Sequence, residues 1–292
     1  MSKLKENLKA GKFVVTSEIG PPKGVNIDHL LKDAEMLKDK VVAINVTDNQ
    51  SAVVRVGSLA ISHLLAQRGI EPVYQMVTRD RNRIAIQSDL LSAWVLGIEN
   101  ILCITGDHPS LGDHQEAKPV YDLDSVNLLK TVTMLNEGSD MAGNELEGKP
   151  SFFHGAVVTP EYDPVELQII KMKKKIDAGA QFFQTQAVFD VKSFEKFMNK
   201  VAGFNVPILA GIVVLKSAGM ANYMNKNVAG VFVPDDIVEE MAKTPKEDRK
   251  KKAVEIAAKI IREIKPMCQG IHIMPLGWDD TVPPIIQQAE LM

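Results

Sequence analysis

Two acidic side chains stand at the ends of apolar stretches, where a carboxyl group could act on a bound molecule. Glu18 lies in the stretch TSEIGPP and Asp107 in CITGDHP. A carboxyl group in a partly dry cavity has a raised pKa and can donate a proton near neutral pH. The two prolines after Glu18 stiffen the chain and could hold its carboxyl group in place. Glu18 is therefore a candidate general acid, and Asp107 a candidate ligand-facing carboxylate.

Each of these candidates also has an ordinary structural explanation. Glu18 could form a salt bridge at the rim of the fold, and the residues around Asp107 could simply end a strand or cap a helix. Gln75 and Gln186 interrupt other apolar runs, and their amides could serve either a ligand or the fold. The residue types alone leave these alternatives open.

The elements that must position these residues are short β-branched runs that alternate with segments of helical periodicity. The predicted strands are 13–17, 41–46, 72–77, 101–104, 152–158, 182–186, 208–215 and 270–274. A helical segment is expected after each strand, and the clearest are 27–37, 56–65, 82–96, 125–135, 164–176, 235–242 and 246–264. The polar segment 138–149 is predicted to be a surface loop.

Eight strand–helix units in 292 residues predict an α/β fold of the TIM (β/α)8 barrel type. No shift in composition and no long linker divides the chain, so one domain over residues 1–292 is expected. In such a barrel the functional side chains gather at the carboxyl ends of the strands. Those ends carry Glu18, Thr47, Asp48, Asn49, Gln75, Gly106, Asp107, Thr159, Glu161, Gln186 and Lys216.

Composition and charge narrow the class of partner. The 34 basic and 37 acidic side chains leave a net charge of -3, which gives no electrostatic reason to expect nucleic acid or an anionic membrane surface. The sequence contains neither a secretion signal nor an apolar run of about 18 residues. Two isolated cysteines, Cys103 and Cys268, cannot by themselves form a zinc or iron–sulfur site. A cytoplasmic protein that acts on a small molecule is expected.

Common nucleotide and metal motifs are incomplete. Residues 143–150 come within one residue of a P-loop, but Pro150 replaces the Ser or Thr that would hold magnesium. No GxGxxG sequence follows a predicted strand, which argues against a Rossmann fold. The six histidines lack paired metal-ligand spacing, and His154 and His272 are expected to be satisfied interior residues. No metal site is predicted.

Several of these stretches occur in an order that resembles the methylenetetrahydrofolate reductase family. The stretches are TSEIGPP, NVTD at 45–48, TGD at 105–107, DAGA at 177–180, QTQ at 184–186 and FD at 189–190. The resemblance extends from about residue 13 over nearly the whole chain. Residues 112–126 further resemble a short-chain branch of the family found in acetogens and related anaerobes.

The resemblance implies a TIM barrel with a flavin, either FAD or FMN, at its open end. It implies reduction of 5,10-methylenetetrahydrofolate to 5-methyltetrahydrofolate, a step that serves methionine biosynthesis and the acetyl-CoA pathway. Glu18 matches the family's general acid, which protonates the departing nitrogen when the methylene bridge opens to an iminium ion. Asp107 matches an aspartate beside flavin and folate, whose charge would lower the flavin potential and stabilise the iminium. Gln186 matches a folate-contacting glutamine.

The resemblance also assigns flavin contacts and raises the question of the electron donor. The matched flavin positions are Thr47, Gln75, Thr105, Gly106, Asp107, Thr159 and Lys175, and Gln75 stands where many relatives have a histidine. Met220 and Met224 stand where well-studied relatives place a glutamine and a phenylalanine at the nicotinamide site, which argues against direct use of NADH. NADH or another reductant is still required. A small partner subunit carrying zinc or iron–sulfur clusters is one route, and a homo-oligomer is equally compatible with the sequence.

The sequence is also compatible with two other functions. One is a flavin-barrel oxidoreductase that acts on a different pterin carrier. The other is a barrel subunit that binds folate or a partner protein without a redox step. An intact set of Glu18, Asp107 and Gln186 argues against the second.

Overall fold

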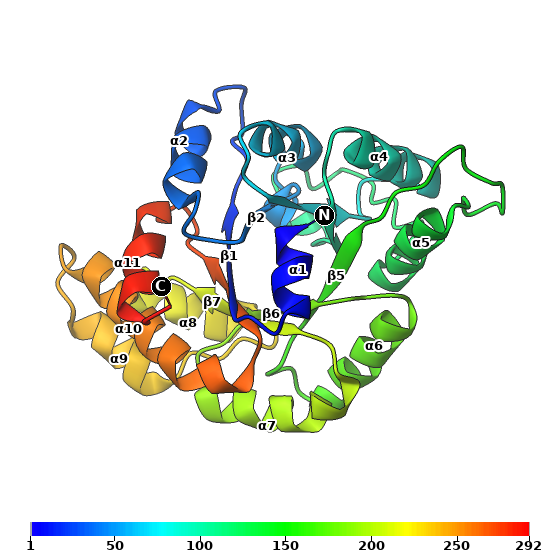
Figure 1. Cartoon of the computed structure of the whole chain (residues 1–292). Coiled ribbons are helices and arrows are strands. Elements are labelled where there is room, and N and C mark those ends of the chain that lie inside the picture. Colours follow the sequence, from blue (N-terminus) through cyan, green and yellow to red (C-terminus); the bar gives the residue numbers. More distant parts are fainter. Residues whose placement is uncertain (1, 292) are drawn as a thin grey trace.

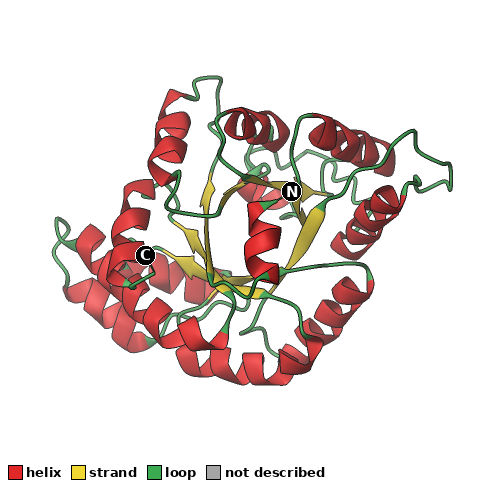
Figure 2. Cartoon of the chain, viewed as in Figure 1, coloured by secondary structure: helices red, strands yellow, loops and turns green. Residues whose placement is uncertain are grey.

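Eight parallel strands close into a barrel, and helices surround it (Figures 1 and 2). The structure is a computed structural model that describes residues 2–291. Each strand pairs with its neighbours in chain order, and the first pairs with the eighth. The strands are β1 (Val14–Ile19), β2 (Ala43–Val46), β3 (Pro72–Val77), β4 (Asn100–Ile104), β5 (Phe153–Val158), β6 (Phe183–Ala187), β7 (Ile208–Val213) and β8 (Gly270–Met274). The prediction of a TIM barrel is confirmed.

The helices lie outside the barrel, apart from the first one. They are α1 (Lys3–Lys9), α2 (Asp28–Leu37), α3 (Ser58–Gln67), α4 (Arg83–Val95), α5 (Ser125–Glu137), α6 (Val165–Asp177), α7 (Val191–Val201), α8 (Ala218–Asn227), α9 (Asp235–Lys243), α10 (Arg249–Ile264) and α11 (Val282–Gln288). Strands β1, β2, β3 and β7 are buried along their whole length, because helices cover their outer face and side chains fill the lumen. This double burial explains why these strands are continuous apolar runs in the sequence.

Helix α1 closes the barrel at the amino ends of the strands. Its Leu4 and Leu8 are buried against lumen residues that include Phe182 and Leu209, and Figure 1 shows the helix lying across this end. The Leu4 amide and the Ser2 hydroxyl both donate to the Glu71 carboxylate just before β3, each at 2.9 Å. The open end of the lumen is therefore the one formed by the carboxyl ends of the strands.

Most predicted boundaries agree with the structure within a few residues, and two differences matter for the site. Strand β1 continues to Ile19, so Glu18 lies inside the strand rather than after it. Helix α1 was not predicted, because seven residues with two leucines are too short for a clear helical period. The loop predicted at 138–149 is confirmed, and Ser139 and Glu145 form an isolated antiparallel β-bridge within it.

Among residues 2–291, no helix is both long enough and apolar enough to cross a membrane.

Candidate functional site

The open mouth of the barrel holds a cavity of about 730 Å³. This volume is typical of small-molecule sites. All nine residues predicted for the site line this cavity. They lie in β1, β3 and β6, directly after β2, β4 and β5, and in helix α6: Glu18, Thr47, Gln75, Thr105, Gly106, Asp107, Thr159, Lys175 and Gln186. Barrel closure thus brings together residues that are far apart in the sequence.

Glu18 is 7% exposed and lies beside a histidine. Its Oε2 is 3.6 Å from Nε2 of His272 in β8, a contact longer than a hydrogen bond. Glu18 also lines a second cavity of about 470 Å³, with Asp33 and Asp279 in its wall. Burial, followed by the charges of Asp33 and Glu18, raises the pKa of Asp279 to about 6. Glu18 therefore stands between the barrel mouth and a second acidic cavity.

A contact with β1 holds the ring of His272 in place. The Thr16 hydroxyl donates to the Ile271 carbonyl at 3.3 Å and lies 3.0 Å from Nδ1 of His272. The other ring nitrogen, Nε2, points toward Glu18. The contact with Thr16 thus orients the ring beside the candidate acid.

Asp107 follows β4 in a turn and is exposed to the cavity. Gly106 before it has φ +86°, a conformation that favours glycine. A Cβ there would lie 3.1 Å from the side chain of Val77, so the turn also packs tightly against β3. Asp107 caps no helix, since His108 does so: its Nδ1 accepts from the Ser110 amide at 3.2 Å, at the start of the 3-10 helix Pro109–Leu111.

Thr47, directly after β2, and Gln75, in β3, present polar groups to the cavity. Thr47 is 3% exposed, and its buried hydroxyl oxygen has no hydrogen-bond partner within residues 2–291. A buried hydroxyl without a partner costs free energy, which a bound ligand can recover by pairing with it. Gln75 is 8% exposed in β3. Both side chains line the cavity.

An amide pair crosses the lumen beneath the cavity. Asn45 of β2 donates to Gln184 of β6 at 2.8 Å, and Gln184 donates back at 3.2 Å. The two amides satisfy each other, so they can lie in the lumen without water. Next to them on β6, Gln186 is exposed to the cavity. The pair forms a polar floor, and neither Asn45 nor Gln184 was predicted as part of the site.

Three lysines of helix α6 line one side of the mouth. Lys171, Lys174 and Lys175 are spaced so that they lie on one face of the helix. Lys175 donates to the Val157 carbonyl at 2.8 Å. Burial, followed by the charge of Lys171, lowers the pKa of Lys175 to about 8. This side of the cavity is cationic, whereas Glu18 and Asp107 make other parts of the wall anionic.

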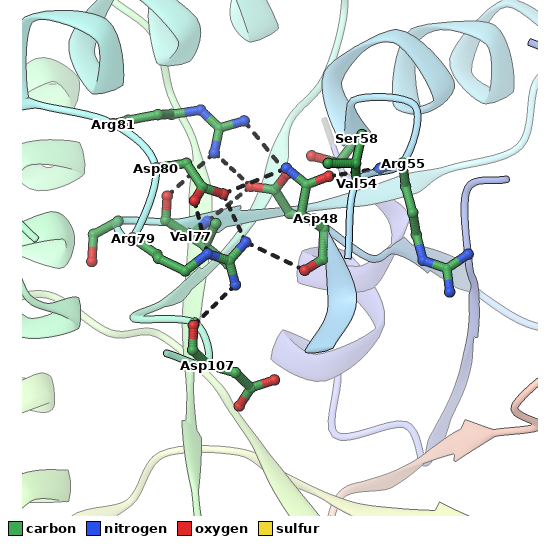
Figure 3. Close-up of polar contacts among 12 residues, drawn as sticks. Asp48, Val54, Arg55, Ser58, Val77, Arg79, Asp80, Arg81 and Asp107 are labelled. Carbon is green, nitrogen blue, oxygen red and sulfur yellow. Dashed lines mark hydrogen bonds and ion pairs between the residues drawn. The ribbon is translucent and has the colours of Figure 1, made fainter. Parts of the chain in front are cut away.

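Two arginine–aspartate groups support the opposite wall (Figure 3). One joins Arg81 to Asp48 at 2.7 Å, and Asp48 also accepts from the Val77 amide at 3.0 Å. The other joins Arg79 to Asp80 at 2.7 Å. Arg79 and Asp48 both line the cavity. The charges of these pairs are mutually compensated, which is the usual condition for burying them.

Two predicted strand-end residues, Glu161 and Lys216, do not line this cavity, and neither do the two methionines at the matched nicotinamide positions. Met224 is 8% exposed in the core cluster around α8, and Met220 packs against the same cluster. Glu161 lines a neighbouring cavity of about 600 Å³. In the part of the chain that the structure describes, no three His, Cys, Asp or Glu side chains group closely enough to hold a metal ion.

Arg79 and His272 are site residues that sequence reasoning missed. His154 behaves as expected of an interior histidine: it lies 3.1 Å from the Thr133 hydroxyl, and burial lowers its pKa to about 4. His272 is also bonded inside the barrel, but it faces Glu18 and lines the mouth. Both histidines occur in apolar strands. Only the strand register shows that His272 lines the cavity and that His154 does not. Arg79 follows the end of β3 by two residues, and this position could have indicated that it lies at the mouth.

Comparison with solved structures shows the same fold elsewhere. A protein from Clostridium thermocellum, solved with two copies of 5-methyl-5,6,7,8-tetrahydrofolic acid bound, aligns over 100% of both chains with a TM-score of 0.68 and 16% identity. A 2,3-dimethylmalate lyase aligns over 99% of this chain and 85% of its own, with a TM-score of 0.54 and 10% identity. At such identities the likeness shows a shared fold.

Sequence relatives are more specific. The chain is 27% identical over 209 residues to 5,10-methylenetetrahydrofolate reductase of Pectobacterium carotovorum subsp. carotovorum, which covers 70% of this chain and 64% of the relative. It is 26% identical to 5,10-methylenetetrahydrofolate reductase of Escherichia coli K12, and the alignment covers 70% of this chain and 65% of the relative. Methylenetetrahydrofolate reductase 2 of Schizosaccharomyces pombe is 26% identical to this chain, and the alignment covers 72% of this chain and 34% of the relative. The alignment thus spans less than two thirds of each relative.

The match to a family profile extends further along the chain than these pairwise alignments. The profile described as Methylenetetrahydrofolate reductase matches residues 3–290. That range includes every strand of the barrel and all nine residues gathered at its mouth. The chain therefore belongs to the methylenetetrahydrofolate reductase family.

Proposed function

We propose that the protein reduces 5,10-methylenetetrahydrofolate to 5-methyltetrahydrofolate with the help of a flavin, and that residues 1–292 act as one flavin-binding domain. The observation that carries the proposal is the convergence of all nine matched residues on one cavity. Membership of the family and the names of its relatives support it. So does the binding of 5-methyltetrahydrofolate by a protein of the same fold.

The residues of the mouth fit a flavin. The unpartnered hydroxyl of Thr47 offers a hydrogen bond deep in the wall. Lys171, Lys174 and Lys175 offer cations for the phosphate that FAD and FMN share. When bound, a flavin carries a hydride from a reductant to the one-carbon unit. The amide of Gln75 and the backbone of Thr105 and Gly106 complete the proposed cofactor contacts.

Glu18 is proposed as the general acid. The methylene bridge of the folate opens to an iminium ion only if the departing nitrogen is protonated. Glu18 reaches the cavity from inside β1 and is 7% exposed, so a substrate above it would exclude most water. His272 lies beside the acid, with Nε2 at 3.6 Å from the Glu18 carboxylate. The rigid strand holds the acid more precisely in position than a loop would.

Asp107 and Gln186 are proposed to act on the charge and orientation of the folate. In the described part of the chain, the Asp107 carboxylate forms no ion pair, so its charge is available to stabilise the positive iminium. That same charge disfavours electron-rich reduced flavin and makes it a stronger hydride donor. Gln186 presents an amide from β6, which can hydrogen-bond the polar edge of a pterin.

The electron donor is proposed to be something other than NADH bound directly at the mouth. Met220 and Met224 belong to the core around α8 instead of the cavity wall, which supports this view. A partner subunit carrying zinc or iron–sulfur clusters is a suitable donor. Both cysteines of this chain are buried, and burial raises the pKa of the Cys103 and Cys268 thiols, the latter to about 11. Neither is suited to ligate a cluster.

The proposal is tested by separating the two half-reactions. Purified protein is expected to be yellow, and its extracted cofactor identifies FAD or FMN; reduction trials with NADH, NADPH and reduced ferredoxin identify the donor. Glu18→Gln should lower the rate of folate reduction by about 10²-fold or more while flavin reduction stays unchanged. The exposed Glu195→Gln on α7 is the matched control.

Three outcomes would contradict the proposal or parts of it. Colourless protein that takes up no flavin would instead support a folate-binding or partner-binding subunit. Faster turnover of another pterin than of methylenetetrahydrofolate would indicate a different carrier. Equal loss of both half-reactions in Glu18→Gln would remove the general-acid role.

A further inference from the structure

Arg79 is a buried arginine at the mouth that the proposed reaction does not use. It lies two residues beyond the end of β3, is 2% exposed and lines the cavity. Figure 3 shows its guanidinium between the loops that follow β2, β3 and β4. These loops adjoin Thr47 and Gln75 and include Asp107. A rigid, five-donor group in this place can fix the three loops relative to one another.

The hydrogen bonds of Arg79 connect all three loops. Nη1 donates to the Asp107 carbonyl at 3.2 Å, and Nη2 donates to the Asn49 carbonyl at 3.3 Å. Nε and Nη2 donate to the two carboxylate oxygens of Asp80 at 2.8 and 2.7 Å. Asn49 has φ +41°, an uncommon backbone conformation for a residue with a side chain. The guanidinium therefore holds a left-handed turn after β2 together with the turn after β4.

The turn that carries Asp107 also packs directly on Arg79. A Cβ on Gly106 would lie 3.3 Å from Nη1 of Arg79 and 3.1 Å from Val77. Main-chain bonds add to this contact, because the Arg79 amide donates to the Thr105 carbonyl at 3.2 Å. The position of the Asp107 backbone is thus set by both the main chain and the side chain of Arg79.

The charge of Arg79 is already taken up by Asp80. The two-point hydrogen bond to Asp80 raises the pKa of Arg79, and the pair is close to neutral as a unit. Arg79 consequently reaches Asp107 through its carbonyl oxygen only. The side-chain charge of Asp107 is left free to face the cavity, which would not hold if Arg79 bound that carboxylate.

We propose that Arg79 is a positioning residue that fixes the distance of the Asp107 carboxylate from the flavin, while Asp80 neutralises Arg79 so that the field of Asp107 reaches the flavin undiminished. This proposal deepens the function proposed above and depends on it. It predicts that changing Arg79 alters the affinity for flavin and the flavin potential. It also predicts that the change in potential requires the Asp107 carboxylate, which would not hold for an arginine that only stabilises the fold.

The test measures the effect of Arg79→Lys in two proteins, the wild type and the Asp107→Asn variant. Lysine keeps the charge but loses the planar fork. Binding of FAD and FMN to apoprotein, followed by flavin fluorescence, should weaken at least tenfold. The midpoint potential of the bound flavin should rise toward that of Asp107→Asn. Adding Arg79→Lys to Asp107→Asn should give no further shift, because the carboxylate it positions is gone.

The matched control is Arg83→Lys, which alters an exposed arginine paired with Asp122 at 2.7 Å. It should leave affinity and potential unchanged. Asp80→Asn is the second variant and keeps the carbonyl contacts of Arg79. It should raise the potential with or without Asp107, because an uncompensated guanidinium favours reduced flavin. It tests the charge argument even if Arg79→Lys does not fold, which thermal unfolding would reveal.

Specific results would overturn the proposal. Equal potential shifts from Arg79→Lys with and without Asp107 would mean that Arg79 acts on the flavin itself. Unchanged affinity and potential would remove any positioning role, and an unchanged potential in Asp80→Asn would remove the charge compensation. If wild-type protein binds no flavin, the proposed function fails first, so the two failures are distinguishable.

Discussion

At the scale of single residues, the site combines one acid held in a strand with another held in a turn. Glu18 is buried within β1 beside His272, while Asp107 is exposed after β4. The two carboxyl groups therefore meet different surroundings, as suits a proton donor and an electrostatic stabiliser. Their roles stay predictions, and each can be tested by removing one charge or one proton.

Asp107→Asn is expected to raise the midpoint potential of the bound flavin and to slow folate reduction by about 10-fold to 100-fold, since a stabilising charge near the iminium is lost. The side chain keeps its size, and the Arg79 contact to the Asp107 carbonyl is retained. Spectroelectrochemical titration and stopped-flow measurement of the folate half-reaction provide the check. An unchanged potential would contradict the electrostatic role.

At the scale of elements, the loops at the carboxyl ends of the strands are tied to each other by buried polar groups. Arg79 joins the loops after β2, β3 and β4. Glu161, after β5, accepts from the Phe232 amide at 3.0 Å and so holds the segment between α8 and α9. Its other carboxylate oxygen is buried without a hydrogen-bond partner in the described residues. This second clamp should depend on pH.

Burial raises the pKa of Glu161 from 4.5 to about 7. A raised carboxyl pKa means that the folded state binds the proton more tightly, so stability is lost as pH rises from about 4.5 to about 7. The full shift corresponds to roughly 3 kcal/mol, which partial exposure reduces to about 1 kcal/mol. Between pH 5 and pH 8, the free energy of unfolding of Glu161→Gln should rise by about 1 kcal/mol relative to that of wild type. Urea unfolding at the two pH values measures this difference.

Glu195→Gln, an exposed change on α7, should leave the dependence of unfolding free energy on pH as in wild type. A constant difference between wild type and Glu161→Gln at the two pH values would show that the carboxyl group does not titrate with folding in this range.

At the scale of the whole molecule, a helix closes one end of the barrel and a cavity occupies the other. Helix α1 covers the amino ends of the strands, and Figure 1 shows it spanning that opening. The mouth at the opposite end contains the cavity and the polar clusters around it. Stability and ligand binding should therefore respond to different substitutions.

Leu4→Ala should lower the free energy of unfolding by about 2–5 kcal/mol, because Leu4 is 0% exposed and its removal leaves a cavity under α1. Flavin affinity of the folded protein should stay within twofold of wild type, since α1 lies at the far end. Thermal unfolding and fluorescence titration measure the two quantities. Ile84→Ala, at a 75% exposed position, is the control and should change stability by less than about 0.5 kcal/mol. A large affinity loss in Leu4→Ala would contradict this separation.

The sequence by itself determined the architecture and which strand-end residues line one cavity. Parallel strands buried on both faces require continuous apolar runs, and eight such runs separated by helical periods allowed the barrel to be predicted. Because strand ends in a barrel share one rim, the order of Glu18, Gln75 and Asp107 along the chain was enough to predict that they meet. Helix α1 escaped prediction because its two leucines form too short a pattern.

Only the tertiary structure decided how these residues are oriented and paired. The register of β1 with β8 places His272 next to Glu18, and strand pairing of this kind is set by contacts between distant segments. The Asn45–Gln184 pair spans 139 residues of sequence. Arg79 could pair with many acids, and its choice of Asp80 together with two carbonyls follows from the closure of three loops. Periodicity identifies which residues are buried, but hydrogen-bond partners across a barrel depend on its closure.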